Sequence, residues 1–194
     1  MRRTCASAAL ALALSACASV PAPSPQKIAP GWVAPAQPLP TDLRRTTLIV
    51  SDFEASLAFY RDALGFIVSY DLPTVMDGIA VPAGEAGDKA RFALLSTNDP
   101  WVGMLGLLAW TDPPLPEPGP YARRVGPGRI VLVIHTDRLE ERCAAAAAVP
   151  GAAIAAPLRE QVYQSRNGTG ELKLRGCTLF DPDGNLVEIN EAQG

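Results

Sequence analysis

Histidine is almost absent from this sequence, which contains one histidine and four cysteines among 194 residues. Metal sites built from imidazole or thiolate groups need several such residues close together, so the composition disfavours them. Charged residues are also scarce, at 19%, and the formal net charge of -3 argues against a strongly basic nucleic-acid binder. Hydrophobic residues make up 48% of the chain, which argues against disorder throughout and leaves room for one compact domain or two small halves.

A short apolar run near the N-terminus indicates export rather than a membrane span. Residues 6–16 follow Arg2 and Arg3 and are fewer than the about 20 residues that a spanning helix needs. The run ends at Leu14-Ser15-Ala16-Cys17, which resembles the bacterial lipoprotein signal. This resemblance implies that residues 1–16 are removed and that Cys17 carries several acyl chains. An ordinary secretory signal is the alternative.

The next segment, residues 17–41, is dominated by proline and alanine. This composition predicts a semi-rigid, polyproline-like stalk that holds a folded domain, residues 42–192, away from the bilayer. Ala18, not aspartate, follows the cysteine, so the resemblance to Gram-negative sorting signals implies a protein of the cell envelope, lipid-anchored at the outer membrane and facing the periplasm.

The first half of the folded part has the predicted order strand, helix and three strands. β-Branched and apolar residues predict a strand at 45–50, and Ser51 with Glu54 is typical of a capping box at the start of a helix. Gly65 is expected to close that helix in a left-handed cap. The further strands are expected over residues 66–70, 91–95 and 102–110.

The same order follows a proline-rich linker, residues 112–127. The second half predicts a helix from Thr136 to Ala148 and strands over residues 129–134, 152–156, 171–180 and 186–190. Arg45 and Arg129 open the two first strands, each seven residues before its helix cap, and they are 84 residues apart. We therefore predict two βαβββ modules, residues 42–111 and 128–192, related by an internal repeat.

Two segments carry a resemblance to a known family. VSDFEASLAFYRDALGF in the first module and FDPDGNLVEIN in the second resemble the vicinal oxygen chelate superfamily, which includes glyoxalase I, bleomycin-resistance proteins and extradiol dioxygenases. The resemblance spans about residues 42–192. It implies an α+β fold in which two βαβββ modules form a curved mixed sheet around a shared cavity. In its metal-dependent members, the first and last strand of each module supply ligands to a divalent ion.

Carried over to this sequence, those ligand positions fall at Arg45, close to Gly106, at Arg129 and at Glu188. Only Glu188 is of the expected type, because a guanidinium is always protonated and has no lone pair for a cation. The resemblance therefore implies a domain without a catalytic metal or other cofactor. Two arginines beside one glutamate would leave a positive pocket suited to carboxylate or phosphate groups. Alternatively, the three charges satisfy one another and only hold the modules together.

We predict that the domain binds a small amphiphilic or anionic molecule in the cavity that the resemblance implies. The cavity-facing residues would be Arg45, Thr47, Met104, Gly106, Arg129, Val131, Phe180 and Glu188. The alternative is a metal-dependent lyase of the glyoxalase type, or a dioxygenase-like enzyme, with an atypical metal site. The expected partners are a small molecule and, through the lipid, a membrane, without nucleic acid. The chain would act as a monomer or a homodimer.

Three smaller features complete the predictions. Cys143 and Cys177 are the cysteines left in the expected oxidising compartment; they form either a disulfide or two separate buried thiols, and we favour the thiols. Residues 181–185 predict a tight turn rather than a calcium loop, because Pro182 and the early Gly184 break the calcium-loop order. His135 is expected at the surface or at a helix cap.

Overall fold

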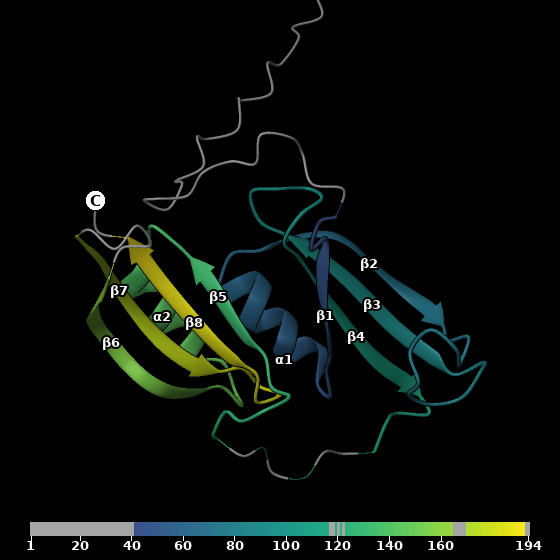
Figure 1. Ribbon diagram of the computed structural model, residues 1–194. Coiled ribbons are helices and arrows are strands. Elements are labelled where there is room, and N and C mark those ends of the chain that lie inside the picture. Colours follow the sequence, from purple (N-terminus) through teal and green to yellow (C-terminus); the bar gives the residue numbers. More distant parts are fainter. Residues whose placement is uncertain (1–40, 117–118, 120, 122, 165–169, 193–194) are drawn as a thin grey trace, which may run out of the picture.

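The computed structural model of the chain describes residues 41–192, apart from residues 117–118, 120, 122 and 165–169 (Figure 1). The predicted signal, the predicted lipidation site Cys17 and nearly all of the predicted stalk lie outside the described residues. Within the described part of the chain, no helix is both long enough and apolar enough to cross a membrane.

The first module forms a four-stranded sheet with a helix on one face. Its elements are β1 (Arg45–Ile49), α1 (Phe53–Leu57), the π-helix η1 (Ala58–Ala63) that continues α1, β2 (Ile67–Val75), β3 (Lys89–Ser96) and β4 (Met104–Asp112). The strand order is β1-β4-β3-β2, with β1 parallel to β4 and the other neighbours antiparallel.

The second module repeats this topology, which confirms the predicted α+β fold of two βαβββ modules. Its elements are β5 (Val131–His135), α2 (Leu139–Ala147), β6 (Ala153–Gln164), β7 (Glu171–Phe180) and β8 (Leu186–Ala192). The order is β5-β8-β7-β6, again with one parallel pair, β5 and β8. In Figure 1 the edge strands β1 and β5 face each other across the middle of the molecule.

The helix starts differ from the predicted ones. Asp52, not Ser51, is the N-cap of α1, and its carboxylate accepts from the backbone N–H of Ala55 at 3.0 Å. Ser51 is used elsewhere, as described below. Thr136 Oγ1 accepts from the N–H of Arg138 at 3.1 Å, so the predicted cap forms a turn that precedes α2. Gly65 closes the first helix at φ +80°, as predicted, a backbone conformation that favours glycine.

The internal repeat has an offset of 86 residues rather than the predicted 84. Val131 begins β5 and Leu139 begins α2, each 86 residues after Arg45 and Phe53, the first residues of β1 and α1. The prediction matched one arginine to the other and counted Thr136 as the helix cap, which shortened the repeat by two residues. Val131, and not Arg129, therefore corresponds to Arg45.

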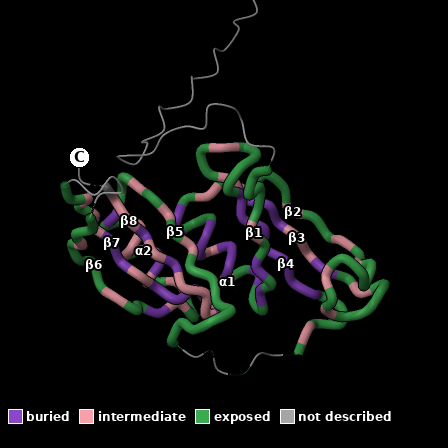
Figure 2. Tube along the Cα trace, viewed as in Figure 1, coloured by how far each residue is buried: buried purple, intermediate pink, exposed green. Residues whose placement is uncertain are grey.

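One hydrophobic core joins the two modules. It contains residues of α1, η1, β1 and β4 together with Leu139 and Ala146 of α2 and Val187 and Ile189 of β8. In Figure 2 buried segments run through α1 and the strands beside it, and β4 is buried along most of its length. The core covers one face of each sheet, the face on which the helices pack. Because strand side chains alternate between the two faces, other residues, including Arg45, Thr47 and Ile49 of β1, lie on the opposite face. We call this the open face.

Candidate functional site

A pocket separates the two facing sheet edges. The first residues of β1 lie beside the last residues of β5, and the pocket between them has a volume of about 280 Å³. We call it the inter-module pocket. Most of its wall is apolar, and the apolar lining includes Phe66, Met104, Leu105, Leu132, Val133 and Ile134.

Polar groups line the rest of the pocket. Thr46, Thr97, Asn98 and His135 contribute hydroxyl, amide and imidazole groups. Three of them, Thr97, Asn98 and His135, also line an adjoining open cleft of about 760 Å³, which extends past the start of α2. His135 is exposed, as predicted, but it lies in the pocket wall at the end of β5 and does not cap α2. An apolar cavity with a few polar groups is typical of small-molecule sites.

Arg45 lies next to this pocket on the open face. Its register partner on β4 is Met104, which lines the pocket. The Arg45 guanidinium carbon lies 5.0 Å from the centre of the Phe92 ring, an arrangement in which the cation is attracted to the ring face. Thr47 pairs with Gly106 on the same face. A Cβ at Gly106 would lie 2.8 Å from both Thr47 Oγ1 and Phe92, so glycine leaves room for this ring.

The structure does not bring Arg129 to the same place. Arg129 precedes β5, whose last residues lie beside the start of β1, so the five residues of β5 separate Arg129 from Arg45. At about 3.3 Å per residue this is a separation of more than roughly 15 Å along the strand. Val131, not Arg129, stands at the strand position of Arg45, and none of Arg45, Arg129 and Glu188 is among the residues that line the inter-module pocket. The convergence of these three charges on one cavity stays a prediction.

The remaining predicted residues are distributed over the second sheet. Glu188 is the register partner of Val133, a residue of the pocket wall, and its carboxylate accepts from the Asn190 side chain at 3.1 Å. Val131 pairs with Leu186 and is 45% exposed on the open face. Phe180 is buried at the end of β7, between Ala153 and Leu186.

The residues at the four strand positions do not form a metal-binding set. With the corrected repeat they are Arg45, Gly106, Val131 and Glu188, which offer one carboxylate and no imidazole or thiolate. Among the described residues, no three His, Cys, Asp or Glu side chains are grouped so that they could hold a metal ion.

Two buried aspartates of the turn between β7 and β8 attach it to the first module. Asp183 Oδ1 accepts from the backbone N–H and the hydroxyl of Ser51, at 2.8 and 2.6 Å, and Oδ2 accepts from the Ser56 hydroxyl at 3.0 Å. Asp181 accepts from the Tyr60 hydroxyl at 2.7 Å. The turn itself is as predicted, but its contacts with the first module were missed, because a sequence pattern identifies a turn and not what packs against it.

The Asp181 and Asp183 carboxylates in this contact accept hydrogen bonds from neutral groups and are buried. Burial raises the pKa of the Asp181 carboxyl, and the hydrogen bonds from Asn185 and Tyr60 only partly oppose this. Burial also raises the pKa of the Tyr60 hydroxyl well above its usual value, and the neighbouring Asp181 charge adds to that rise. The tyrosine is therefore held as a neutral donor.

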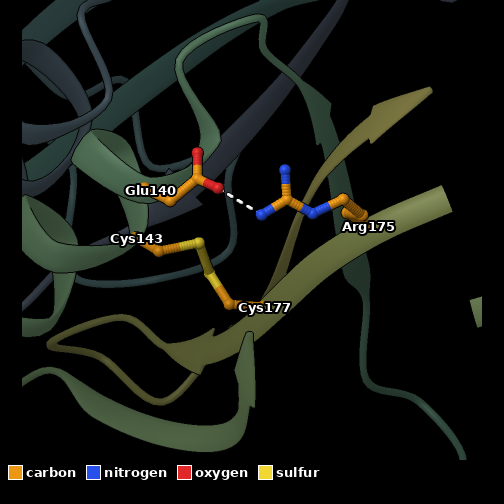
Figure 3. Close-up of a disulfide and its surroundings, with 4 residues drawn as sticks. All are labelled: Glu140, Cys143, Arg175 and Cys177. Atoms are coloured by element: carbon orange, nitrogen blue, oxygen red, sulfur yellow. Dashed lines mark hydrogen bonds and ion pairs between the residues drawn. A yellow bond between two sulfur atoms is a disulfide. The ribbon is translucent and has the colours of Figure 1, made fainter. Parts of the chain in front are cut away.

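Cys143 and Cys177 form a disulfide, not the two separate thiols that we favoured (Figure 3). It joins α2 to β7, because both side chains extend into the layer between the helix and the sheet. Arg175 of β7 and Glu140 of α2 form an ion pair beside it. A disulfide that closes a loop of 34 residues contributes about 3 to 4 kcal/mol in the chain-entropy model.

Comparisons with known proteins identify a family. The model of the Glyoxalase/Bleomycin resistance protein/Dioxygenase superfamily matches residues 42–189. No curated protein matches the chain significantly.

Several solved structures are similar to the chain. A glyoxalase family protein from Bacillus cereus has a TM-score of 0.62 at 16% identity, over 83% of this chain and 100% of that one. A glyoxalase/dioxygenase from Nostoc punctiforme has a TM-score of 0.51 at 20% identity, over 84% and 100%. An antibiotic binding protein from Streptomyces has a TM-score of 0.47 at 21% identity, over 79% and 97%. At these identities the likeness of the first two shows the fold alone.

Proposed function

We propose that this chain, which belongs to the Glyoxalase/Bleomycin resistance protein/Dioxygenase superfamily, binds a small amphiphilic anion in the inter-module pocket. The observation that carries the proposal is the position of Arg45 beside a largely apolar pocket. Its neighbour on β4, Met104, lines that pocket. The apolar body of the ligand lies against Met104, Val133 and Ile134. Its anionic group binds the Arg45 guanidinium.

The charge of Arg45 is available for a ligand. Within the described residues the ion pairs of the chain involve other side chains, and Arg45 contacts the Phe92 ring instead. A guanidinium presents two parallel N–H groups that match a carboxylate, sulfonate or phosphate. Glu188, beside Val133 on the opposite wall, offers an acceptor to a hydroxyl or amide of the same ligand.

Removing the charge tests the anion site. We expect Arg45→Gln to weaken binding of 8-anilinonaphthalene-1-sulfonate about 10-fold or more, since a charge-assisted hydrogen bond contributes about 1.5–3 kcal/mol. The neutral N-phenyl-1-naphthylamine should bind the variant as it binds the wild type. Fluorescence titration measures both. Arg44→Gln is the matched control, because it removes the same charge one residue away, from a guanidinium that stacks on Trp101 at 3.5 Å. An equal loss of affinity for both dyes in the Arg45→Gln variant would contradict the proposal.

Filling the pocket tests its location. Val133 is 63% exposed and lines the pocket, so Val133→Trp should block both dyes without overpacking the core. Val131→Trp is the control, because Val131 is also exposed on the open face of β5 but does not line the pocket. Unchanged binding to the Val133 variant would place the dye elsewhere on the molecule.

We further propose that a lipid on Cys17 holds this domain at the outer membrane, on its periplasmic side. The support is the sequence Leu14-Ser15-Ala16-Cys17 behind a short apolar run, followed by a proline-rich segment long enough to act as a spacer. In a Gram-negative host, the full chain should fractionate with membranes and give an acylated N-terminal peptide by mass spectrometry. Cys17→Ser should abolish acylation and membrane fractionation. An acyl-free mature wild type would refute the anchor.

A further inference from the structure

A second, smaller apolar cluster lies on the open face of the first sheet. Its buried members are Ala90, Leu108 and Trp110. Residues 76–88, which we call the β2–β3 loop, fold back over this cluster and add Met76, Val81 and Ala83. The cluster adjoins the proposed anion site, because the Phe92 ring belongs to its edge and also lies under Arg45.

The polar contacts of the β2–β3 loop are made within the loop. The N–H of Met76 donates to Asp88 O, and that of Gly87 to Met76 O, both at 2.9 Å, so the two ends of the loop are paired. In the part of the chain that the structure describes, the Asp77 carboxylate accepts from the N–H groups of Ile79 and Ala80, and the Asp88 carboxylate accepts from that of Glu85. Among the described residues, no hydrogen bond joins residues 77–86 to β4 or to the linker. Residues 77–86 are therefore held on the sheet by apolar contact alone. This is expected of a segment that opens as a unit.

Trp110 has a buried donor beneath this loop. The residue is 5% exposed, and its Nε1 finds no acceptor among the described residues. Gly84 of the loop lies directly against it, since a Cβ at Gly84 would be 2.5 Å from Nε1. Buried donors without an acceptor are rare in native proteins, and each one requires an explanation.

We propose that the β2–β3 loop is a lid over a second binding subsite, in which the ligand replaces Met76, Val81 and Ala83 and accepts a hydrogen bond from Trp110 Nε1. The inference rests on the proposed function and specifies its ligand. Gly106, beside the Arg45 site, and Trp110 are four residues apart on β4, or about 13 Å at 3.3 Å per residue. The ligand is thus an elongated amphiphile with an anionic end and an oxygen acceptor farther along its apolar body.

Two glycines of the loop provide a matched pair of variants. Both Gly84 and Gly87 have positive φ, +68° and +98°, so alanine is strained at either position. Only at Gly84 does the added Cβ meet Trp110 Nε1 and Asp88 Oδ2, whereas nothing lies within 4 Å of it at Gly87. Gly84→Ala should therefore open the lid, and Gly87→Ala should reproduce the backbone strain without doing so.

The experiment uses the full chain with Trp32 and Trp101 replaced by phenylalanine, so that Trp110 is the remaining tryptophan. We expect acrylamide to quench Trp110 fluorescence severalfold more efficiently in the Gly84→Ala variant than in the Gly87→Ala variant. 12-Hydroxydodecanoate, an elongated amphiphile with a carboxylate at one end and a hydroxyl oxygen at the other, should shift the indole N–H signal of Trp110 in a ¹⁵N–¹H spectrum. Trp110→Phe, which keeps the ring contact, should weaken binding of 12-hydroxydodecanoate about fivefold or more.

The outcomes separate the two proposals. 12-Hydroxydodecanoate binding that depends on Arg45 but leaves the Trp110 signal unmoved, with equal quenching in the two glycine variants, would overturn the lid and leave the proposed function intact. Binding that does not depend on Arg45 would refute the proposed function, and the subsite with it. A moved Trp110 signal together with Arg45-dependent binding supports both.

Discussion

At the scale of single residues, the attachment of one module to the other depends on side chains that the sequence marks only as a turn and a helix. Tyr60 is completely buried, and its hydroxyl donates to Asp181 from the other module. Ser51 donates to Asp183 instead of capping α1, so Asp52 takes over the cap. A capping box is a local pattern, and in this chain a contact 132 residues away in sequence outcompetes it.

The Tyr60 hydroxyl therefore stabilises the fold. Tyr60→Phe removes one of two donors to the buried Asp181 Oδ2, the other being the Asn185 side chain at 3.0 Å, and a hydrogen bond to a charged group contributes about 1.5–3 kcal/mol. We expect a loss of that size in the free energy of unfolding, measured by urea denaturation at pH 7. Tyr70→Phe is the control, because Tyr70 is 40% exposed, and it should change stability by less than about 0.5 kcal/mol. Equal stability of the two variants would show that the Asp181 contact contributes nothing.

At the scale of elements, hydrophobic patterning predicted every helix and strand, and the errors lie in length and register. β6 extends to Gln164, although a strand of five residues was expected, because pairing with β7 continues past Pro157 through two register shifts. The offset of the repeat was wrong by two residues, which placed Arg129 at a strand position that Val131 occupies. Both errors concern pairing between strands, which the sequence of one strand does not specify.

The disulfide belongs to the same scale. The sequence placed Cys143 on the sheet-facing side of its helix and left open whether Cys177 met it. The structure has α2 packed directly on β7, with the two Cα atoms 6.3 Å apart. This distance depends on how the helix crosses the sheet, which is a property of the packed module and not of either segment.

At the scale of the whole molecule, the shared core and the buried aspartates couple the two modules, so the chain should unfold as one unit whose stability depends on pH. The pKa shifts of Asp181 and Asp71 change the stability of the fold in opposite directions as the pH varies. The folded-state pKa of Asp181 is raised, chiefly by burial, so its contribution is present below its unfolded pKa of about 3.9 and is lost as pH rises through the folded value. The hydrogen bonds from Arg91 lower the pKa of Asp71, so its contribution is present above about pH 3.9 and is lost as pH falls.

A pair of asparagine variants separates these two effects. As pH falls from 7 to 4, the wild type should gain stability relative to Asp181→Asn, because the native protein then takes up a proton at the buried carboxyl. Over pH 5 to 3 it should lose stability relative to Asp71→Asn, because the Arg91 contact loses its charged partner. Urea denaturation at each pH gives both differences, and each variant is the control for the other. Parallel stability curves for the wild type and Asp181→Asn would mean that the carboxyl is solvated in solution and that the two modules are less tightly joined there.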